Sequence, residues 1–440
     1  MSFPNKYINS LDSLNYYSAT KKYDLRYPAL KQDLEADVVI IGGGFSGINT
    51  ALELAEQGVK NIVVLEARHL GYGGTGRNGG QIMAGIGHDM DAIKKDVGEE
   101  GLQAIFEISN QGQQIIKERV KRYNIDADFR NGYGYTAFNK RQQKVLQEWQ
   151  KEFQTLEPDT EIELVTGSAI QDVVGTDAYC AVLKHMGGGH VHSLNLLLGE
   201  ANALTSEYGV QIFENTEVLE VEYGPRVTVR TAMGSVKAEK MLWACNAFLK
   251  GLEPRLHKKT INTLAFQIAT EPLSDELIHR ISPIRGAYSD IRPVIDYYRV
   301  TNENRLLFGG ATHLVEYLPK DLFAWNRNLM LRIFPYLANV KIDMAWGGPM
   351  ACGVNLFPQI GSLDNHNNVF YVQGYAGFGV TPSQIICKVL AEGILGGSDR
   401  YQLISSISHA DIVAKDQLRA LLLTGGKCWH QLNGYLSGRR

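Results

Sequence analysis

The chain is poor in cysteine, with five among its 440 residues, at positions 180, 245, 352, 387 and 428. Their number is odd, and no two of them stand in a C-x-x-C spacing. This pattern excludes a disulfide framework and a zinc site built on cysteine pairs. The cysteines are therefore predicted to be reduced thiols.

The chain also lacks an excess of charge of one sign and a long apolar run. The formal net charge is -3 and the pI is near 6.4, so no basic footprint for a nucleic acid is present. The apolar stretch 38–54 is interrupted by glycines and polar residues, and the N-terminus has no secretory signal pattern. We expect a soluble, cytoplasmic protein with neither a nucleic-acid nor a membrane partner.

Glycine, by contrast, is abundant, and its first cluster is the most informative. The run DVVIIGGGFSGIN joins an apolar strand to a helix through Gly42-x-Gly44-x-x-Gly47. Gly42 permits a tight turn, Gly44 lets the backbone approach a pyrophosphate, and Gly47 lets the helix pack close to the strand. The helix start at Phe45 and Ser46 offers bare N–H groups to phosphates. This pattern predicts a dinucleotide-binding turn rather than a glycine-rich turn without a ligand.

An acidic residue completes this unit. Glu66 ends a second apolar strand, nineteen residues after Gly47. A carboxylate at that place can accept hydrogen bonds from ribose hydroxyls. The strand–helix–strand context with its acid is much more specific than the glycines alone, but it does not choose between NAD and FAD.

Two further glycine-rich segments follow. Residues 71–80 read GYGGTGRNGG, which is too rich in glycine for a helix or a strand. Thr75, Arg77 and Asn78 are its candidate donors to a phosphate or a ring. Residues 374–381 read GYAGFGVT, at the end of a predicted strand and the start of a predicted helix. A helix N-terminus there would stabilise an anionic ring.

These segments resemble those of FAD-dependent amine and amino-acid oxidoreductases of the D-amino-acid oxidase superfamily. Residues 71–80 are similar to the family's ASGRNGG segment. The resemblance extends over nearly the whole chain, through GGGHVHSLNLLLGEANAL from Gly187, VIDYYRVTNENRLLFGG from Val294 and VFYVQGYAGFGVTPSQIICKVLAEGIL from Val369. Within the superfamily, the bacterial γ-glutamylputrescine oxidoreductases of polyamine catabolism are the most similar.

The resemblance implies one FAD per chain. It should be bound non-covalently, because no Cys or His falls at a position matching the family's flavin-linked residues, and Cys352 is close but offset. Many relatives have His where this chain has Phe378. The residues that the resemblance and the motifs assign to the cofactor are Gly42, Gly44, Phe45, Ser46, Gly47, Glu66, Ala67, Arg68, Gly74, Thr75, Arg77, Asn78, Gly79, Gly80, Gln81, Val218, Ala244, Gly377, Phe378, Gly379, Val380 and Thr381.

The resemblance also bears on the substrate. Tyr297 and Tyr298 alternate on a predicted strand, so one can line the amine pocket while the other packs in the sheet, and Tyr298 is the one predicted to bind substrate. Trp346 is predicted to lie near the flavin, with a role in the core as the alternative. Met350 stands where glycine- and D-amino-acid-oxidising relatives have the arginine of a W-x-G-x-R pattern.

Sarcosine-oxidising relatives use a lysine where this chain has Thr381. A substrate carboxylate beside the reacting carbon would therefore be buried without a charged partner, at a cost of several kcal/mol. This favours a substrate whose carboxylate is far from its amine, such as γ-glutamylputrescine.

The predicted fold is α/β, with a Rossmann-like FAD-binding domain and an inserted substrate domain built on a mixed or antiparallel sheet. The FAD-binding domain is expected in three pieces, 30–88, 165–250 and 345–440. The substrate domain takes 89–164 and 251–344, and 1–29 form an N-terminal extension. Helices are predicted over 89–123, from an N-cap at Ser193 to 208, and over 325–338. Strands over 210–213, 216–222, 226–231 and 241–244 suggest a β-meander.

The predicted activity is FAD-dependent oxidative deamination of a primary amine, with molecular oxygen as the second substrate. No catalytic base is assigned, because a neutral amine needs none. Three alternatives remain: a glycine, sarcosine or D-amino-acid oxidase, an amine dehydrogenase passing electrons to a carrier, and a non-catalytic FAD-binding protein. The pair His190 and His192 lacks further ligands nearby in sequence, so no metal is predicted. The oligomeric state stays undetermined.

Overall fold

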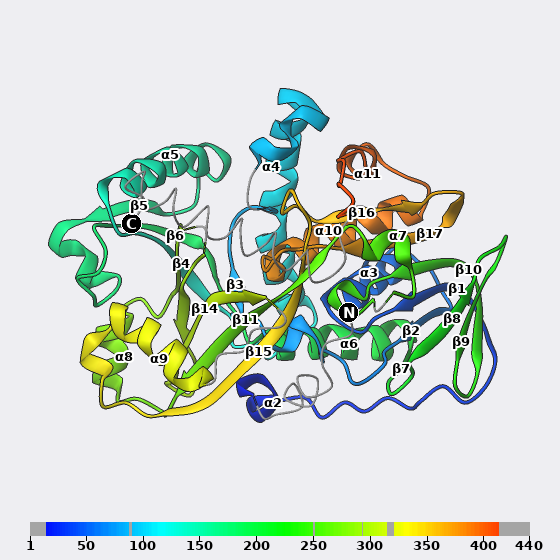
Figure 1. Ribbon diagram of the computed structural model, residues 1–440, viewed down its shortest axis with the longest axis horizontal. Coiled ribbons are helices and arrows are strands. Elements are labelled where there is room, and N and C mark those ends of the chain that lie inside the picture. Colours follow the sequence, from blue (N-terminus) through cyan, green and yellow to red (C-terminus); the bar gives the residue numbers. More distant parts are fainter. Residues whose placement is uncertain (1–14, 88–89, 250, 293, 315–320, 413–440) are drawn as a thin grey trace.

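The computed structural model describes residues 15–87, 90–249, 251–292, 294–314 and 321–412. Within these residues the strands form two β-sheets, seen at the right and at the left of Figure 1. Across the same residues, no helix combines the length and the apolar character needed to span a membrane. Cys428 lies outside the described residues.

The first sheet has the strand order β16-β17-β10-β1-β2-β7. Val38 and Ile40 of β1 enter one core, and Val39 and Ile41 enter the core on the opposite face. Because both faces are buried, the run shows no alternation with polar residues. β1 pairs in parallel with β2 and β10. The strands are β1 Leu34–Ile41, β2 Ile62–Leu65, β7 Gln211–Phe213, β10 Ser235–Trp243, β16 Gln359–Leu363 and β17 His366–Gln373.

Helices contribute to the core on one face of this sheet, namely α3 (Phe45–Glu56), α4 (Asp91–Arg122), α6 (Ser193–Tyr208) and α10 (Val380–Ile394). The core on the other face includes β8 (Val218–Glu222), β9 (Val227–Thr231) and α7 (Pro254–His257). β8, β9 and β10 pair antiparallel in succession, as in the predicted meander, but the strand predicted over 210–213 is β7, which instead pairs in parallel with β2. The helix predicted over 89–123 is α4, interrupted at Gly98, where φ is 69°.

The second sheet has the order β15-β11-β14-β13-β12-β4-β6-β3, with β5 beside β6. β12, β13 and β14 pair antiparallel in succession, as their short connections predict, and β11 pairs antiparallel with β14 and β15. Its strands are β3 Gln81–Ile82, β4 Arg130–Ala137, β5 Ile162–Thr166, β6 Ala181–His190, β11 Ile261–Thr270, β12 Ala287–Asp290, β13 Tyr297–Val300, β14 Leu306–Leu314 and β15 Ile342–Cys352.

Each face of the second sheet carries its own helices. α8 (Asp275–Ile281) and α9 (Leu322–Ile333) share a core with Tyr298 and Phe308. α5 (Lys140–Leu156) packs on the other side, where Leu146 meets Tyr133 and Leu183. The remaining elements are α2 (Tyr16–Thr20), α11 (Asp399–Ser405) and the short 3-10 helices η1 (Gly74–Gly76), η2 (Gly167–Asp172), η3 (Asn246–Phe248) and η4 (Pro335–Leu337).

Three strands depart from the predicted domain boundaries. β3, β6 and residues 345–352 of β15 fall in the ranges given to the FAD-binding domain, yet all three belong to the second sheet. β6 pairs with β4, for example Leu183 with Tyr135. An apolar strand pattern shows that a segment is buried, but it does not show which sheet receives it. The division into an FAD-binding and a substrate domain stays a prediction.

The start of α6 also differs from the prediction. Its N-cap is His192, whose Nδ1 accepts a hydrogen bond from the N–H of Asn195 at 3.1 Å. Ser193 is the first helical residue, and its hydroxyl instead donates to Asn78 Oδ1 at 2.6 Å. A histidine is a less common cap than serine, which is why the sequence pattern favoured Ser193.

Candidate functional site

A cavity of about 1910 Å³ lies between the two sheets, lined by residues from both. It is lined by Ile41 at the carboxyl end of β1, by Tyr297 of β13 and by Val380 at the start of α10. In open parallel sheets, ligands bind in the crevice outside the carboxyl ends of the strands. We refer to it below as the junction cavity.

Most of the residues predicted to bind the cofactor line the junction cavity. They are Gly42, Gly44, Phe45, Ser46, Glu66, Ala67, Arg68, Gly74, Thr75, Arg77, Asn78, Gly79, Gln81, Val218, Ala244, Gly377, Phe378, Gly379 and Val380. These segments are far apart in sequence and meet only in the fold. Their contact with FAD stays a prediction.

The first glycine turn is shaped by close backbone packing. Gly42 has a φ of 118°, a conformation that residues with a side chain rarely adopt. A Cβ at Gly47 would lie 1.9 Å from the carbonyl oxygen of Gly42, so only glycine permits this approach of helix and turn. Gly44 is the N-cap of α3 and makes no side-chain cap, and although the N–H of Phe45 donates to Thr75 Oγ1, the next N–H groups of the first turn are left for a phosphate.

Glu66 holds this turn in place. Its Oε2 accepts a hydrogen bond from the N–H of Gly43 at 2.7 Å, and its Oε1 accepts one from the N–H of Arg68 at 2.8 Å. Burial raises the pKa of the Glu66 carboxyl, and these N–H groups oppose the rise. Each oxygen keeps a second lone pair, so hydrogen bonds to a ribose remain open to it.

In the second glycine-rich loop, residues 71–80, several polar groups form hydrogen bonds within the protein. Thr75 Oγ1 accepts from the N–H of Phe45 at 3.1 Å, which ties the loop to the start of α3. Asn78, predicted as a donor to the ligand, instead donates from Nδ2 to the carbonyls of Gly74 and Thr75 at 3.1 and 2.8 Å. Its Oδ1 is also engaged by Ser193. The asparagine therefore shapes the loop.

Arg77, another predicted donor in this loop, is buried beside Tyr72. Its Nε donates to the carbonyl oxygen of Tyr72 at 2.9 Å, and its guanidinium carbon lies 5.6 Å from the centre of the Tyr72 ring. The backbone carbonyl of Arg77 accepts from Gln267 and Trp346. Arg77 thus anchors the loop to β11 and β15 while still lining the cavity.

Three predicted cofactor residues do not line the cavity, namely Gly47, Gly80 and Thr381. Gly47 packs on the carbonyl of Gly42. Gly80 packs against the second sheet, where a Cβ would lie 2.2 Å from the carbonyl oxygen of Val191. Thr381 is buried in the first turn of α10, and its Oγ1 accepts from the N–H of Met83 at 3.1 Å. Helix position alone does not indicate on which side of the first turn a side chain points, which explains the error for Thr381.

The two neighbouring tyrosines of β13 take opposite roles from those predicted. Tyr298 lies in the core between α9 and the sheet, stacked on Phe308 with ring centres 5.8 Å apart. Tyr297 lines the junction cavity, and a Cβ at Gly79 would touch its ring. The alternation was predicted, but a strand buried on both faces gives no sign of which side holds the cavity.

Of the other two residues predicted to bind substrate, one lies in the core and one lines the cavity. Trp346 is buried in the core, where its Nε1 donates to the Arg77 carbonyl at 3.2 Å and its ring meets Tyr17 edge-on. It does not line the cavity, so it takes the alternative role in the core. Met350 does line the cavity, and its sulfur lies 2.8 Å from where a Cβ of Gly377 would be.

Sequence reasoning missed an aromatic wall on the side of the second sheet. Tyr135 of β4 meets Trp149 and Phe153 of α5, with ring centres 5.6 and 5.9 Å apart, and all three line the cavity. The Tyr135 hydroxyl accepts from the N–H of Ala84. In the sequence Trp149 and Phe153 look like the core face of an ordinary helix and Tyr135 like an ordinary strand residue, so no signal distinguished them.

Sequence reasoning also missed the charged groups of this side, Glu152, Asp290, Arg292 and Arg332. Burial raises the pKa of Glu152. Among the described residues that line the cavity there is no lysine and no histidine. The cavity thus contains no described side chain that ordinarily acts as a base at neutral pH except carboxylates.

The two histidines of the H-x-H pair serve different partners. His190 bonds through Nε2 to the carbonyl oxygen of Arg285 at 3.0 Å, and His192 caps α6 and meets Thr20 Oγ1. Burial lowers the pKa of each to about 3, so both are neutral. Within the described ranges, no three His, Cys, Asp or Glu side chains are grouped so as to hold a metal ion.

Cys352 is the thiol to consider for a covalent link, because it lines the cavity. Its Sγ lies 3.5 Å from Thr263 Oγ1, and burial raises its pKa to about 11. A thiol with such a pKa is a poor nucleophile at neutral pH. This favours the predicted non-covalent cofactor.

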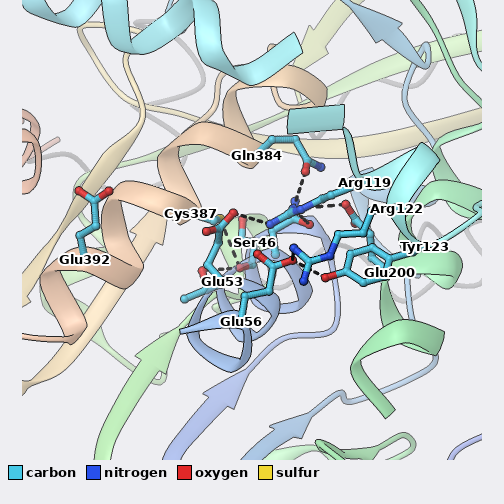
Figure 2. Close-up of polar contacts among 12 residues, drawn as sticks. Ser46, Glu53, Glu56, Arg119, Arg122, Tyr123, Glu200, Gln384, Cys387 and Glu392 are labelled. Atoms are coloured by element: carbon cyan, nitrogen blue, oxygen red, sulfur yellow. Dashed lines mark hydrogen bonds and ion pairs between the residues drawn. The ribbon is translucent and has the colours of Figure 1, made fainter. Parts of the chain in front are cut away.

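Behind α3, opposite its N-terminus, a buried ionic cluster joins four helices (Figure 2). Arg119 of α4 lies 2.6 Å from Glu53 of α3 and 3.4 Å from Glu200 of α6. Its Nη1 also donates to Gln384 of α10 at 2.6 Å. The cluster fixes the axis of the helix whose first N–H groups face the cavity.

The cavity fits FAD in three respects. It offers a glycine turn that a Cβ would fill, an α-helix N-terminus toward a pyrophosphate, and an acid at the end of β2. The cavity also reaches the second sheet, where Tyr297 of β13 and Met350 of β15 line it.

These features define an FAD-dependent oxidoreductase, and comparison with known proteins agrees. Residues 37–393 match the family of FAD dependent oxidoreductases known as DAO, and the chain belongs to this family. It is 35% identical to γ-glutamylputrescine oxidoreductase of Escherichia coli strain K12 over 423 residues, which cover 96% of this chain and 98% of that protein.

Solved structures show the same fold. Glycine oxidase from Geobacillus kaustophilus superposes with a TM-score of 0.67 at 17% identity, over 83% of this chain and 96% of that one. L-proline dehydrogenase from P. horikoshii gives a TM-score of 0.69 at 20% identity, over 83% and 95% of the two chains. The predicted combination of an FAD-binding Rossmann-like unit and a second sheet is thereby confirmed.

Proposed function

We propose that the chain oxidises a primary amine at the end of a flexible chain, with γ-glutamylputrescine as its substrate. The carbon that carries the amine would lose a hydride and the nitrogen a proton, leaving an imine, with bound FAD supplying the two-electron acceptor. Water would hydrolyse the imine to an aldehyde and ammonia, and molecular oxygen would take up the two electrons to give hydrogen peroxide. Full-length similarity to a relative named for this substrate supports the proposal.

Met350 is the observation that carries the substrate assignment. It lines the cavity beside Gly377, at the place where glycine- and D-amino-acid-oxidising relatives have a carboxylate-binding arginine. Thr381, at the place of the lysine of sarcosine-oxidising relatives, is bonded to Met83 and faces away from the cavity. An α-carboxylate beside the reacting carbon would therefore be desolvated without a cation, which is costly.

In this scheme the residues of the chain orient the cofactor and the substrate and keep water from the reacting amine. The N-terminus of α10 and the turn from Gly377 to Gly379 place positive partial charge at one edge of the cofactor. Tyr297 and the aromatic wall of Tyr135, Trp149 and Phe153 exclude water from the amine pocket. The amine enters in its neutral form, so no residue is required as its base.

Anaerobic reduction of the bound flavin tests the proposal. The holoenzyme is mixed with γ-glutamylputrescine, putrescine, sarcosine, glycine and a D-amino acid, and bleaching of the flavin absorbance is followed. We expect γ-glutamylputrescine to have the highest kcat/KM and putrescine a much lower one, since the glutamyl head adds remote binding energy. Faster reduction by sarcosine, glycine or a D-amino acid would refute the substrate assignment. Stoichiometric peroxide in air would then distinguish an oxidase from a dehydrogenase.

A further inference from the structure

A compact ionic cluster sits where the cavity meets the turn between β12 and β13. Arg292 donates from Nη2 to Asp290 Oδ2 and to Asp296 Oδ2, each at 2.6 Å, and from Nε to Asp290 Oδ1 at 3.0 Å. Its guanidinium carbon lies 4.6 Å from the centre of the Phe138 ring. The two aspartates are buried, so this arginine is fixed by partners within the protein.

A second arginine at the same place has no such partner. Arg332 lies in the last turn of α9, lines the cavity and is exposed. Among the described residues its guanidinium makes no hydrogen bond and no ion pair, although its charge acts on Asp296. The contrast with Arg292 matters, because only a cation without a committed partner can offer its donors in full to an incoming anion.

A series of contacts connects the second glycine-rich loop, residues 71–80, with Arg332. A Cβ at Gly79 would lie 2.8 Å from the Tyr297 ring, and the same ring covers Gly309. The next residue of β14, Gly310, borders Asp296 Oδ1 and lines the cavity with Arg332. Arg332, whose charge acts on Asp296, is therefore connected through Gly310 and Tyr297 to the loop of residues 71–80.

We propose that Arg332 binds the carboxylate at the far end of the substrate. The hydrogen-bonded cluster of Asp290, Arg292 and Asp296 lies beside it, and Asp290 and Arg292 form the adjacent part of the cavity wall. The inference rests on the proposed function and names the group that selects an amine with a distant carboxylate. In γ-glutamylputrescine about eight bonds, roughly 10 Å when extended, separate the reacting carbon from the carbon that bears the carboxylate. A guanidinium can bind such a carboxylate through two parallel hydrogen bonds.

The cavity's other cations do not suit this role. Arg77 is tied to Tyr72 in the loop that approaches the cofactor, and Arg68 lies at the end of the cavity near Glu66. Arg292 is neutralised by two aspartates. Arg332 is thus the cation on the substrate side that carries uncompensated donors.

The test uses the holoenzyme and a ligand that cannot react, γ-glutamylbutylamide, which keeps the glutamyl head but has no terminal amine. Its Kd is measured by calorimetry for wild type, Arg332→Ala, Arg332→Lys and the control Arg327→Ala. Arg327 lies on the same helix but does not line the cavity. We expect Arg332→Ala to weaken binding about tenfold, the loss of one charged hydrogen-bonding group. Arg332→Lys should restore part of it, and Arg327→Ala should bind as wild type does.

Steady-state kinetics separate selectivity from general damage. Arg332→Ala should lower kcat/KM for γ-glutamylputrescine about tenfold and leave it unchanged for N-acetylputrescine, which has the same chain without a carboxylate. An equal fall for both substrates, or unchanged Kd for γ-glutamylbutylamide, would overturn the role of Arg332. If wild type oxidises neither amine but Arg332→Ala still weakens γ-glutamylbutylamide, the proposed reaction fails while the carboxylate site stands.

Discussion

Arg119 Nη2 of helix α4 lies 2.6 Å from Glu53 Oε1 of helix α3 in the interior of the protein (Figure 2). Both side chains are buried, and the same guanidinium reaches Asn49 and Gln384. A buried ion pair contributes little net stability compared with an apolar pair, but removing one partner leaves an uncompensated charge. The ion pair therefore matters for the position of α3, whose opposite end lines the junction cavity.

Arg119→Met tests this cluster. We expect it to lower the free energy of unfolding by about 3–5 kcal/mol, because Glu53 and Glu200 would stay buried without their cation. The measurement is a denaturant or thermal midpoint of the holoenzyme. The control is Arg122→Met, three residues along the same helix, where an exposed guanidinium pairs with Glu56 at 3.3 Å. That exposed pair is worth less than about 1 kcal/mol. Equal losses in the two variants would contradict the prediction.

Glu200 makes stability depend on pH. Burial raises its pKa from an ordinary value of 4.5 to about 7, against the favourable charge of Arg119. Between these two values the folded protein binds more protons than the unfolded chain, so stability falls as pH rises through about 7. We expect the melting temperature to fall from pH 5.5 to pH 8.5, and Glu200→Gln to reduce that fall. Glu56→Gln, which changes a partly buried carboxyl on α3, serves as the control. If the melting temperature of Glu200→Gln falls with pH as much as that of wild type, Glu200 is not the group responsible.

Glu66 should control the affinity for FAD. Its two oxygens hold the N–H groups of Gly43 and Arg68, and the carboxylate remains available to ribose hydroxyls. We expect Glu66→Ala to weaken FAD binding by about 1.5–3 kcal/mol, the range for a hydrogen bond to a charged group. Fluorescence titration of the apoprotein with FAD measures this, with Glu66→Gln as the conservative variant that keeps one acceptor. Unchanged affinity in both variants would remove Glu66 from the cofactor site.

The rate of flavin reduction should rise with pH. A primary amine has a pKa of about 10, and its neutral form is the one that gives up hydride. No lysine or histidine is found among the described residues of the cavity wall, so a protein base at neutral pH would have to be a carboxylate. At subsaturating substrate, anaerobic reduction should accelerate about tenfold per pH unit between pH 7 and 9. A flat profile would indicate an enzyme base or another slow step.

Local patterns in the sequence predicted the parts of this protein that depend on backbone geometry. The turn Gly42–Gly47 forms because Gly42 can adopt a φ of 118° and Gly47 lets the helix pack against the turn. Both requirements are visible in the spacing of the glycines within one short segment. The buried strand at 38–41 follows from its continuous apolar run, and the strands over 218–243 and the helix after Gly379 follow from the spacing of their apolar residues. For the same reason the family and its cofactor were recognisable before the fold was known.

The direction of a side chain could not be predicted from the sequence wherever both faces of its strand or helix are apolar. Tyr297 and Tyr298 are chemically alike and adjacent, yet one lines the cavity and the other stacks on Phe308. Trp346 and Thr381 sit at positions that motif alignment placed beside the flavin, and packing directs both into the core.

The sequence by itself therefore determined the dinucleotide turn, the class of cofactor and the absence of a cation at Met350, because each depends on residue type within one short segment. The tertiary structure alone decided that Arg332, from a helix with no motif, joins Asp290 and Arg292 in the wall of the same cavity. Such a meeting depends on how the second sheet and its helices pack, and packing is a property of the whole chain rather than of any window within it.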